Sequence, residues 1–142
     1  SFLCFCHIIL IFHYNTEVSN MTNKELIERF YDEVFNSRDL SNLDQYMKDD
    51  YIQHNPTAES GKEGFIRFCD KFLAMKPHME IKQIIAENDL VCVFFKCTME
   101  ANGMENKVFD LYRIENGKLA EHWDCVEHDI GKIAPLHDNG LF

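Results

Sequence analysis

Asp110, Tyr112, His122 and Asp124 are the side chains best suited to chemistry, and all four fall within residues 108–126. The stretch reads as two strands joined by a tight turn. Alternate side chains of a strand share a face. Asp110 and Tyr112 therefore lie on one face of the first strand, and His122 and Asp124 lie on one face of the second. Two carboxylates and an imidazole in one pocket are the groups that general acid–base catalysis uses.

The turn between these strands decides whether the two pairs meet. Residues 115–117 allow a three-residue loop with Gly117 left-handed, which sets Asp110 opposite His122. A two-residue Asn-Gly loop would set Asp110 opposite Trp123. A slip of one residue moves every side chain to the other face, so the residues alone leave the choice open.

Asp110 is the candidate oxyanion donor or second acid. Its expected neighbours are Val93, Phe95 and Tyr112, and a carboxyl in such surroundings can keep its proton and donate a hydrogen bond to an oxyanion. With Phe65, these three side chains would form the substrate-binding wall. The alternative is a buried acid with a purely structural hydrogen bond.

Asp124 is the candidate general acid or base, and His122 is its partner because an imidazole can change charge near neutral pH. His54, before Asn-Pro in a loop, could reach the same pocket mouth. The alternatives are a structural His–Asp pair for His122 and a turn residue for His54. No His-x-His or His-Glu-x-x-His pattern is present, so we expect no metal and no cofactor.

Length and charge restrict the class of protein. A chain of 142 residues that is 46% hydrophobic suits one folded domain. Its net charge of -10, without a Lys/Arg cluster, argues against nucleic acid or an anionic membrane as a partner. The six cysteines lie mostly in apolar patterns, which favours reduced thiols and a cytoplasmic location over a disulfide framework.

Residues 1–20 differ from the rest, with an apolar run too short to span a bilayer. We expect the native protein to begin at Met21 and residues 1–20 to be an extension outside the fold; a short hydrophobic anchor is the alternative. The folded domain is predicted over residues 21–129, followed by a tail over residues 130–142.

Capping boxes at residues 22–25 and 60–63 predict two helices with apolar stripes, and residues 40–50 predict a short helix between them. Strands are predicted over residues 79–86, 90–101, 104–114 and 118–127, which gives an α+β protein with helices on one sheet face. The other face is also apolar, so we expect a homodimer through it; cover by the tail or by the extension is the alternative.

The chain resembles the SnoaL-like branch of the nuclear-transport-factor-two-like superfamily. The resemblance rests on residues 51–56 (Tyr-Ile-Gln-His-Asn-Pro), on Gly61 and Gly64-Phe65, and on the hairpin from Asp110 to the Glu-His-Trp-Asp run that ends at Asp124. It implies a cone in which about three N-terminal helices pack on the concave face of a curved antiparallel sheet. It also implies a pocket between them and, usually, a dimer.

The resemblance also implies roles for the two acids. The acid/base aspartate of the SnoaL polyketide cyclase falls on Asp124, while the pocket histidine of that enzyme falls on Asp110. The protonated oxyanion-hole acid of ketosteroid isomerase also falls on Asp110, but its general base falls near His54, where this chain has no acid. In both relatives the two hairpin positions point into the pocket, which favours the three-residue turn.

Together these observations predict a cofactor-free cyclase or isomerase. It would act on a small hydrophobic carbonyl compound by enolisation or aldol-type chemistry. The alternative of another class is a non-catalytic ligand-binding or dimerisation module of the same fold.

Overall fold

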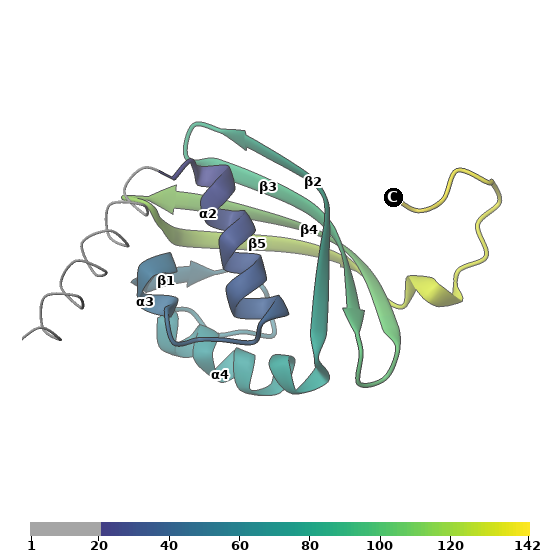
Figure 1. Ribbon diagram of the computed structural model, residues 1–142, viewed down its shortest axis with the longest axis horizontal. Coiled ribbons are helices and arrows are strands. Elements are labelled where there is room, and N and C mark those ends of the chain that lie inside the picture. Colours follow the sequence, from purple (N-terminus) through teal and green to yellow (C-terminus); the bar gives the residue numbers. More distant parts are fainter. Residues whose placement is uncertain (1–20) are drawn as a thin grey trace, which may run out of the picture.

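The computed structural model describes residues 21–142, so the predicted extension lies outside the described residues. The described chain forms a five-stranded curved sheet in the order β1-β5-β4-β3-β2, with the helices on one face (Figure 1). Strands β2 to β5 form an antiparallel meander, and β1 joins β5 in parallel. The predicted α+β class, with three helices on a curved sheet, is confirmed.

The elements in chain order are α2 (Asn23–Phe30), the π-helix η1 (Tyr31–Asn36), α3 (Leu43–Tyr46), β1 (Met47–Gln53), α4 (Lys62–Phe72), η2 (Leu73–Met75), β2 (Pro77–Glu87), β3 (Leu90–Met99), β4 (Met104–Glu115), β5 (Lys118–Glu127) and η3 (Ile130–Lys132).

Helix α2 begins where the sequence predicts. Thr22 Oγ1 accepts a hydrogen bond from Glu25 N (3.2 Å) and the Glu25 carboxylate accepts one from Thr22 N (2.8 Å), which completes a capping box. The apolar stripe continues into η1, where Tyr31 is fully buried. The second predicted capping box is wrong: α4 has no side-chain cap, and Ser60 Oγ instead accepts a hydrogen bond from Gln53 N (3.1 Å).

The short helix predicted over residues 40–50 ends earlier than predicted. Helix α3 stops at Tyr46, and β1 takes the residues that follow. Met47 and Tyr51 on β1 are each 1% exposed, and β1 pairs with β5 through contacts such as Met47 with Leu119. Burial of these two side chains and pairing with a free sheet edge therefore outweigh the local helical pattern.

The β4–β5 hairpin closes with a two-residue turn, so the predicted three-residue turn is wrong. Asn116 and Gly117 both have positive φ angles (52° and 71°), and Glu115 pairs with Lys118. The register then shifts at Ala120, an extra residue of β5 that has no partner on β4.

The bulge at Ala120 places Asp110 and Asp124 on the same face of the sheet, which is the result that the predicted three-residue turn was expected to give. Beyond it, Tyr112 pairs with His122, and Asp110 pairs with Asp124. The predicted pairing of Asp110 with His122 is therefore also wrong, because the partner of Asp110 lies two residues further along β5. Since a shift of two residues conserves the face, both acids still point to the helix-covered side.

The main core fills the space between the helices and the sheet. Aromatic rings from η1, α4 and the strands meet edge to face there, for example Tyr31 with Phe95 (5.2 Å between centroids) and Phe35 with Phe72 (5.8 Å). The four cysteines of the described chain are free thiols, as predicted. Burial raises the pKa of Cys69 and of Cys97 to about 12 each.

We expect the free energy of unfolding to fall as the pH rises above about 9. An unfolded thiol ionises near pH ~8.5, whereas the buried Cys69 and Cys97 hold their protons until about 12. The unfolded state therefore releases protons that the folded state keeps, which lowers stability by up to ~1.4 kcal/mol per pH unit for each thiol. Urea unfolding across this pH range measures the slope.

Replacing both thiols, Cys69→Ala with Cys97→Ala, should flatten that slope. The matched control is Cys125→Ala, which removes an exposed thiol and should leave the slope unchanged. A slope that is the same in the double variant and in the control would contradict this linkage.

Candidate active site

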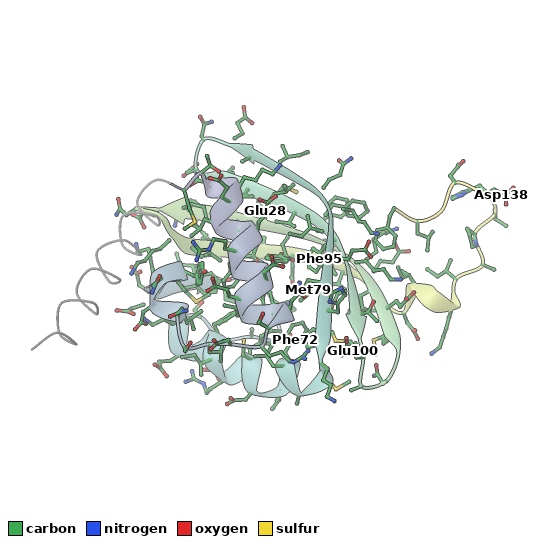
Figure 2. All side chains as sticks on the ribbon, in the orientation of Figure 1. Glu28, Phe72, Met79, Phe95, Glu100 and Asp138 are labelled. Atoms are coloured by element: carbon green, nitrogen blue, oxygen red, sulfur yellow. The ribbon has the colours of Figure 1, made fainter. Side chains whose placement is uncertain are left out.

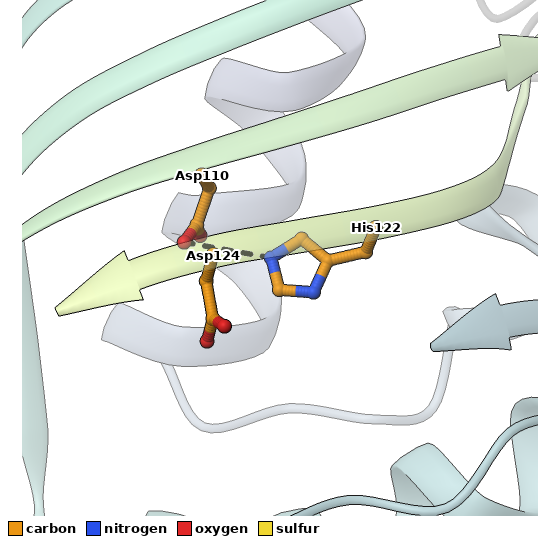
Figure 3. Close-up of side chains that lie close together, drawn as sticks. All are labelled: Asp110, His122 and Asp124. Carbon is orange, nitrogen blue, oxygen red and sulfur yellow. Dashed lines mark ion pairs between the residues drawn. The ribbon is translucent and has the colours of Figure 1, made fainter. Parts of the chain in front are cut away.

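Asp110, His122 and Asp124 meet on the helix-covered face of β4 and β5 (Figure 3). One nitrogen or oxygen atom from each side chain lies within 4.8 Å of those of the other two. Asp110 and His122 are each only 7% exposed, and Asp124 is half-buried. The structure thus brings together three of the four residues predicted to be catalytic.

Two tyrosine hydroxyls hold Asp110. Tyr112 Oη donates to Asp110 Oδ2 (3.0 Å), and Tyr31 Oη, from η1, donates to the same oxygen. Burial, followed by the nearby Asp110 charge, raises the pKa of both tyrosines well above the ordinary value of ~10. Both hydroxyls therefore keep their protons through the physiological pH range and remain donors to Asp110.

The residues singled out from the sequence do not include Tyr31. The available signal was its type: a tyrosine on a fully buried stripe needs a partner for its hydroxyl. The residue that supplies this partner lies on β4, 79 positions later, and only the folded chain shows the contact.

His122 is oriented by Gln53. Gln53 Oε1 accepts a hydrogen bond from the backbone N–H of Asn55 (2.9 Å), which fixes the orientation of the amide, and the same oxygen lies 2.9 Å from His122 Nδ1. His122 Nδ1 therefore carries a proton. Its other ring nitrogen, Nε2, is buried, lies 3.4 Å from Asp110 Oδ1 and makes no hydrogen bond within the described chain.

Asn55 positions Asp124. Its Nδ2 donates to Asp124 Oδ2, while its Oδ1 accepts hydrogen bonds from Thr57 N (2.8 Å) and Thr57 Oγ1 (2.6 Å). The amide is thus fixed at both ends. The sequence prediction passed over Asn55 in favour of its neighbour His54. Alternation along this extended segment gives the signal, because residues 51, 53 and 55 share one face and His54 lies on the other.

His54 is not brought to the acids. Its ring stacks on Trp123 (4.7 Å between centroids, 6° between planes), and its Nε2 lies 2.9 Å from Glu121 Oε1. Trp123 lies between His122 and Asp124 on β5, so it points to the opposite face of the sheet. His54 therefore lies on that opposite face, and the side chain is 43% exposed.

Asp110 and Asp124 line a cavity of about 410 Å³ between the helices and the sheet. Its size lies in the range of pockets that hold small molecules. The wall is mainly aromatic rings, methionines and valines, with no Lys or Arg among its residues. Phe72, Met79 and Phe95 are three of these wall residues (Figure 2).

The residues predicted to bind substrate occupy two layers. Phe95 lines the cavity. Val93, Tyr112 and Phe65 are buried in the core behind the cavity wall, where Tyr112 contacts Asp110 and stacks on the His122 ring (4.6 Å between centroids).

The three clustered side chains could also hold a cation. Two carboxylates and an imidazole are ligands that divalent metals such as Mn²⁺ or Fe²⁺ accept. The tautomer that Gln53 imposes leaves His122 Nε2 free to act as such a ligand.

The curved sheet, the covering helices and the acid-bearing apolar cavity define a small α+β protein built around a ligand-sized pocket. The chain belongs to the SnoaL-like domain family, whose model matches residues 27–122. A comparison with curated proteins gave no match. Within residues 21–142, the helices are too short or too polar to cross a membrane.

Solved structures with the same fold include TsrD from Streptomyces laurentii (20% identity, TM-score 0.63, covering 76% of this chain and 92% of that one). A SnoaL-like polyketide cyclase from Agrobacterium tumefaciens is similar (17% identity, TM-score 0.63, covering 75% and 92%). So is a protein of unknown function from Cytophaga hutchinsonii that is described as NTF2-like (19% identity, TM-score 0.62, covering 79% and 94%). At identities this low, the structural similarity establishes the shared fold alone.

We expect neutral His122 to carry its proton on Nδ1, the less common tautomer in water. The cause is the Gln53 oxygen, which can only accept. Nitrogen-15 NMR of the imidazole distinguishes the two tautomers. Gln53→Leu removes the acceptor and should return the proton to Nε2, while exposed His54 is the internal reference. A proton on Nε2 of neutral His122 in the unaltered chain would contradict the arrangement.

Proposed function

We propose that this protein is a SnoaL-like enzyme of the cyclase or isomerase type. It removes a proton next to a carbonyl group of a small hydrophobic compound, without a cofactor. The observation that carries the proposal is the pair of acids, Asp110 and Asp124, facing each other in the wall of an apolar cavity. Positioned carboxyls in a site of low polarity are suited to moving protons between carbon and oxygen.

Asp124 is the general base. Asn55 holds Oδ2, and no hydrogen bond of the described chain engages Oδ1, which is therefore available to a substrate. The C–H electron pair becomes the carbon–carbon double bond of an enolate, and the proton moves to Asp124. Returning the proton to a different carbon of a conjugated enolate completes an isomerisation. In an aldol-type ring closure, the enolate carbon instead attacks a second carbonyl group, whose π electrons move to its oxygen, and that oxygen takes the proton back from Asp124.

Asp110 is the group that stabilises the enolate oxygen. Tyr31 and Tyr112 hold Oδ2, so Oδ1 is the oxygen that can carry and donate a proton. His122 Nε2 lies 3.4 Å from Oδ1 and can accept this proton from Asp110. The resulting imidazolium then donates to the enolate oxygen in place of Asp110. A donor fixed in advance at the position of the developing charge is an effective way to lower the barrier.

A binding module without turnover is the second candidate. The observation that favours it is the deep burial of Asp110 under two tyrosine hydroxyls, an arrangement that a purely structural acid also has. The two candidates differ in whether Asp124 transfers a proton.

The predicted homodimer belongs to the same proposal. The sheet face away from the helices carries a Phe94–Phe109 stack (4.4 Å between centroids), and Phe109 is 48% exposed. Phe142 from the tail packs against Phe94 (5.6 Å between centroids), so the tail covers part of this face. Dimerisation through the remainder and a cytoplasmic location stay predictions.

We expect the protein to catalyse hydrogen–deuterium exchange at the methyl group of 4-acetylbiphenyl, a hydrophobic methyl ketone, and Asp124→Asn to slow this by about a hundredfold or more. Proton NMR in deuterated water follows the loss of the methyl signal. The matched control is Glu127→Gln, which neutralises an acid on the outward face of the same strand and should leave the rate unchanged.

Two outcomes would count against the proposal. Full exchange activity in Asp124→Asn would remove the base assigned here. Loss of activity in a chelator, with recovery on adding Mn²⁺ or Fe²⁺, would replace acid–base chemistry without a cofactor by metal-assisted chemistry at the same three residues.

A further inference from the structure

We propose that the cavity contains a second polar subsite at Asn106, which binds a neutral hydrogen-bond acceptor at the far end of an elongated substrate. The acceptor is a ketone, ester or ether oxygen. The identity of the reacting end, at Asp110 and Asp124, rests on the proposed function; the subsite itself rests on Asn106.

Asn106 is a buried polar residue with an unused donor. It is 4% exposed and lines the cavity. Its Oδ1 accepts a hydrogen bond from the backbone N–H of Asp129 (3.1 Å), and because that group can only donate, the orientation of the amide is fixed. No hydrogen bond within the described chain uses Nδ2. Nδ2 is not one of the fully enclosed unpaired atoms of the described residues, so it keeps accessible surface through which a ligand in the cavity can reach it.

The position of Asn106 sets the length of the ligand. Asn106, Val108 and Asp110 alternate along β4 on the cavity face, and the four-residue separation between the first and last spans about 13 Å of strand. The wall between them is apolar, with Val108, Phe95 and Val126. A molecule that reaches both ends therefore has two oxygens separated by a rigid or extended apolar middle.

The charge of the cavity selects a neutral acceptor. The charged side chains of the wall are two aspartates, and its one imidazole belongs to exposed His128. A carboxylate or phosphate at the far end would therefore meet repulsion from the acids without a permanent cation to offset it. A carbonyl or ether oxygen accepts from the Asn106 amide without carrying charge. Placed polar groups in an otherwise apolar pocket are what orient a ligand.

The test compares two ketones that differ only at the far end, 4,4′-diacetylbiphenyl and 4-acetylbiphenyl, by isothermal titration calorimetry. We expect the unaltered protein to bind the diketone about three- to tenfold more tightly, the effect of one added hydrogen bond. Asn106→Asp keeps the oxygen that accepts from Asp129 but loses the donor. It should therefore reduce this preference to the roughly twofold statistical advantage of a ligand with two equivalent ends, while leaving the monoketone affinity unchanged.

The matched control is Asn102→Asp. Asn102 Oδ1 accepts from Met104 N (3.0 Å) in the exposed β3–β4 turn, so the same exchange adds the same charge outside the cavity and should keep the preference. Equal affinities for the two ketones in the unaltered protein would overturn the subsite, as would a preference that survives undiminished in Asn106→Asp or a failure to bind either ketone. A diketone preference without any catalysed exchange would support the subsite and refute the proposed enzyme.

Discussion

One extra residue in β5 determines the chemistry available to this fold. Without the bulge at Ala120, the two-residue turn at Asn116 and Gly117 would set Asp110 opposite Trp123 and direct Asp124 to the wrong side of the sheet. With the bulge, the two acids face each other on the side that the helices cover. The pairing of the two acids in the cavity wall and the proposed proton transfer follow from that single shift in register.

Placing two carboxylates in an apolar wall is costly unless other groups support them. Here each acid is supported from a different part of the chain: Tyr31 in η1 holds Asp110, and Asn55, after β1, holds Asp124. Gln53 orients the imidazole of His122 beside them. The π-helix η1 and the segment after β1 thus fix one oxygen of each acid, which leaves the other oxygen to the ligand.

Local patterns predicted much of this structure. The Thr22–Glu25 capping box and the alternation of β3 to β5 report interactions between residues close in sequence or on one face, so the α+β architecture could be read from the chain. The common face of the two acids was favoured only by the family resemblance, because local pattern left the turn open. The bulge at Ala120 could not, because a register shift depends on which side chains pack across the sheet. Residues 47–50 became strand rather than helix for a similar reason: their partner is the edge of β5. Tyr31 and Asn55 gained roles only through partners 79 and 69 positions away.

The proposed chemistry requires Asp110 and Asp124 to act on one ligand oxygen and its neighbouring carbon inside the cavity. A crystal structure with 4-phenylphenol tests it most directly, because the phenol oxygen stands for the enolate oxygen and the rings for the apolar body. We expect the phenol oxygen to lie about 3 Å from the Asp110 carboxyl, with the rings against Phe95 and Val108. A phenol bound with its oxygen turned away from both acids, or bound only outside the cavity, would contradict it.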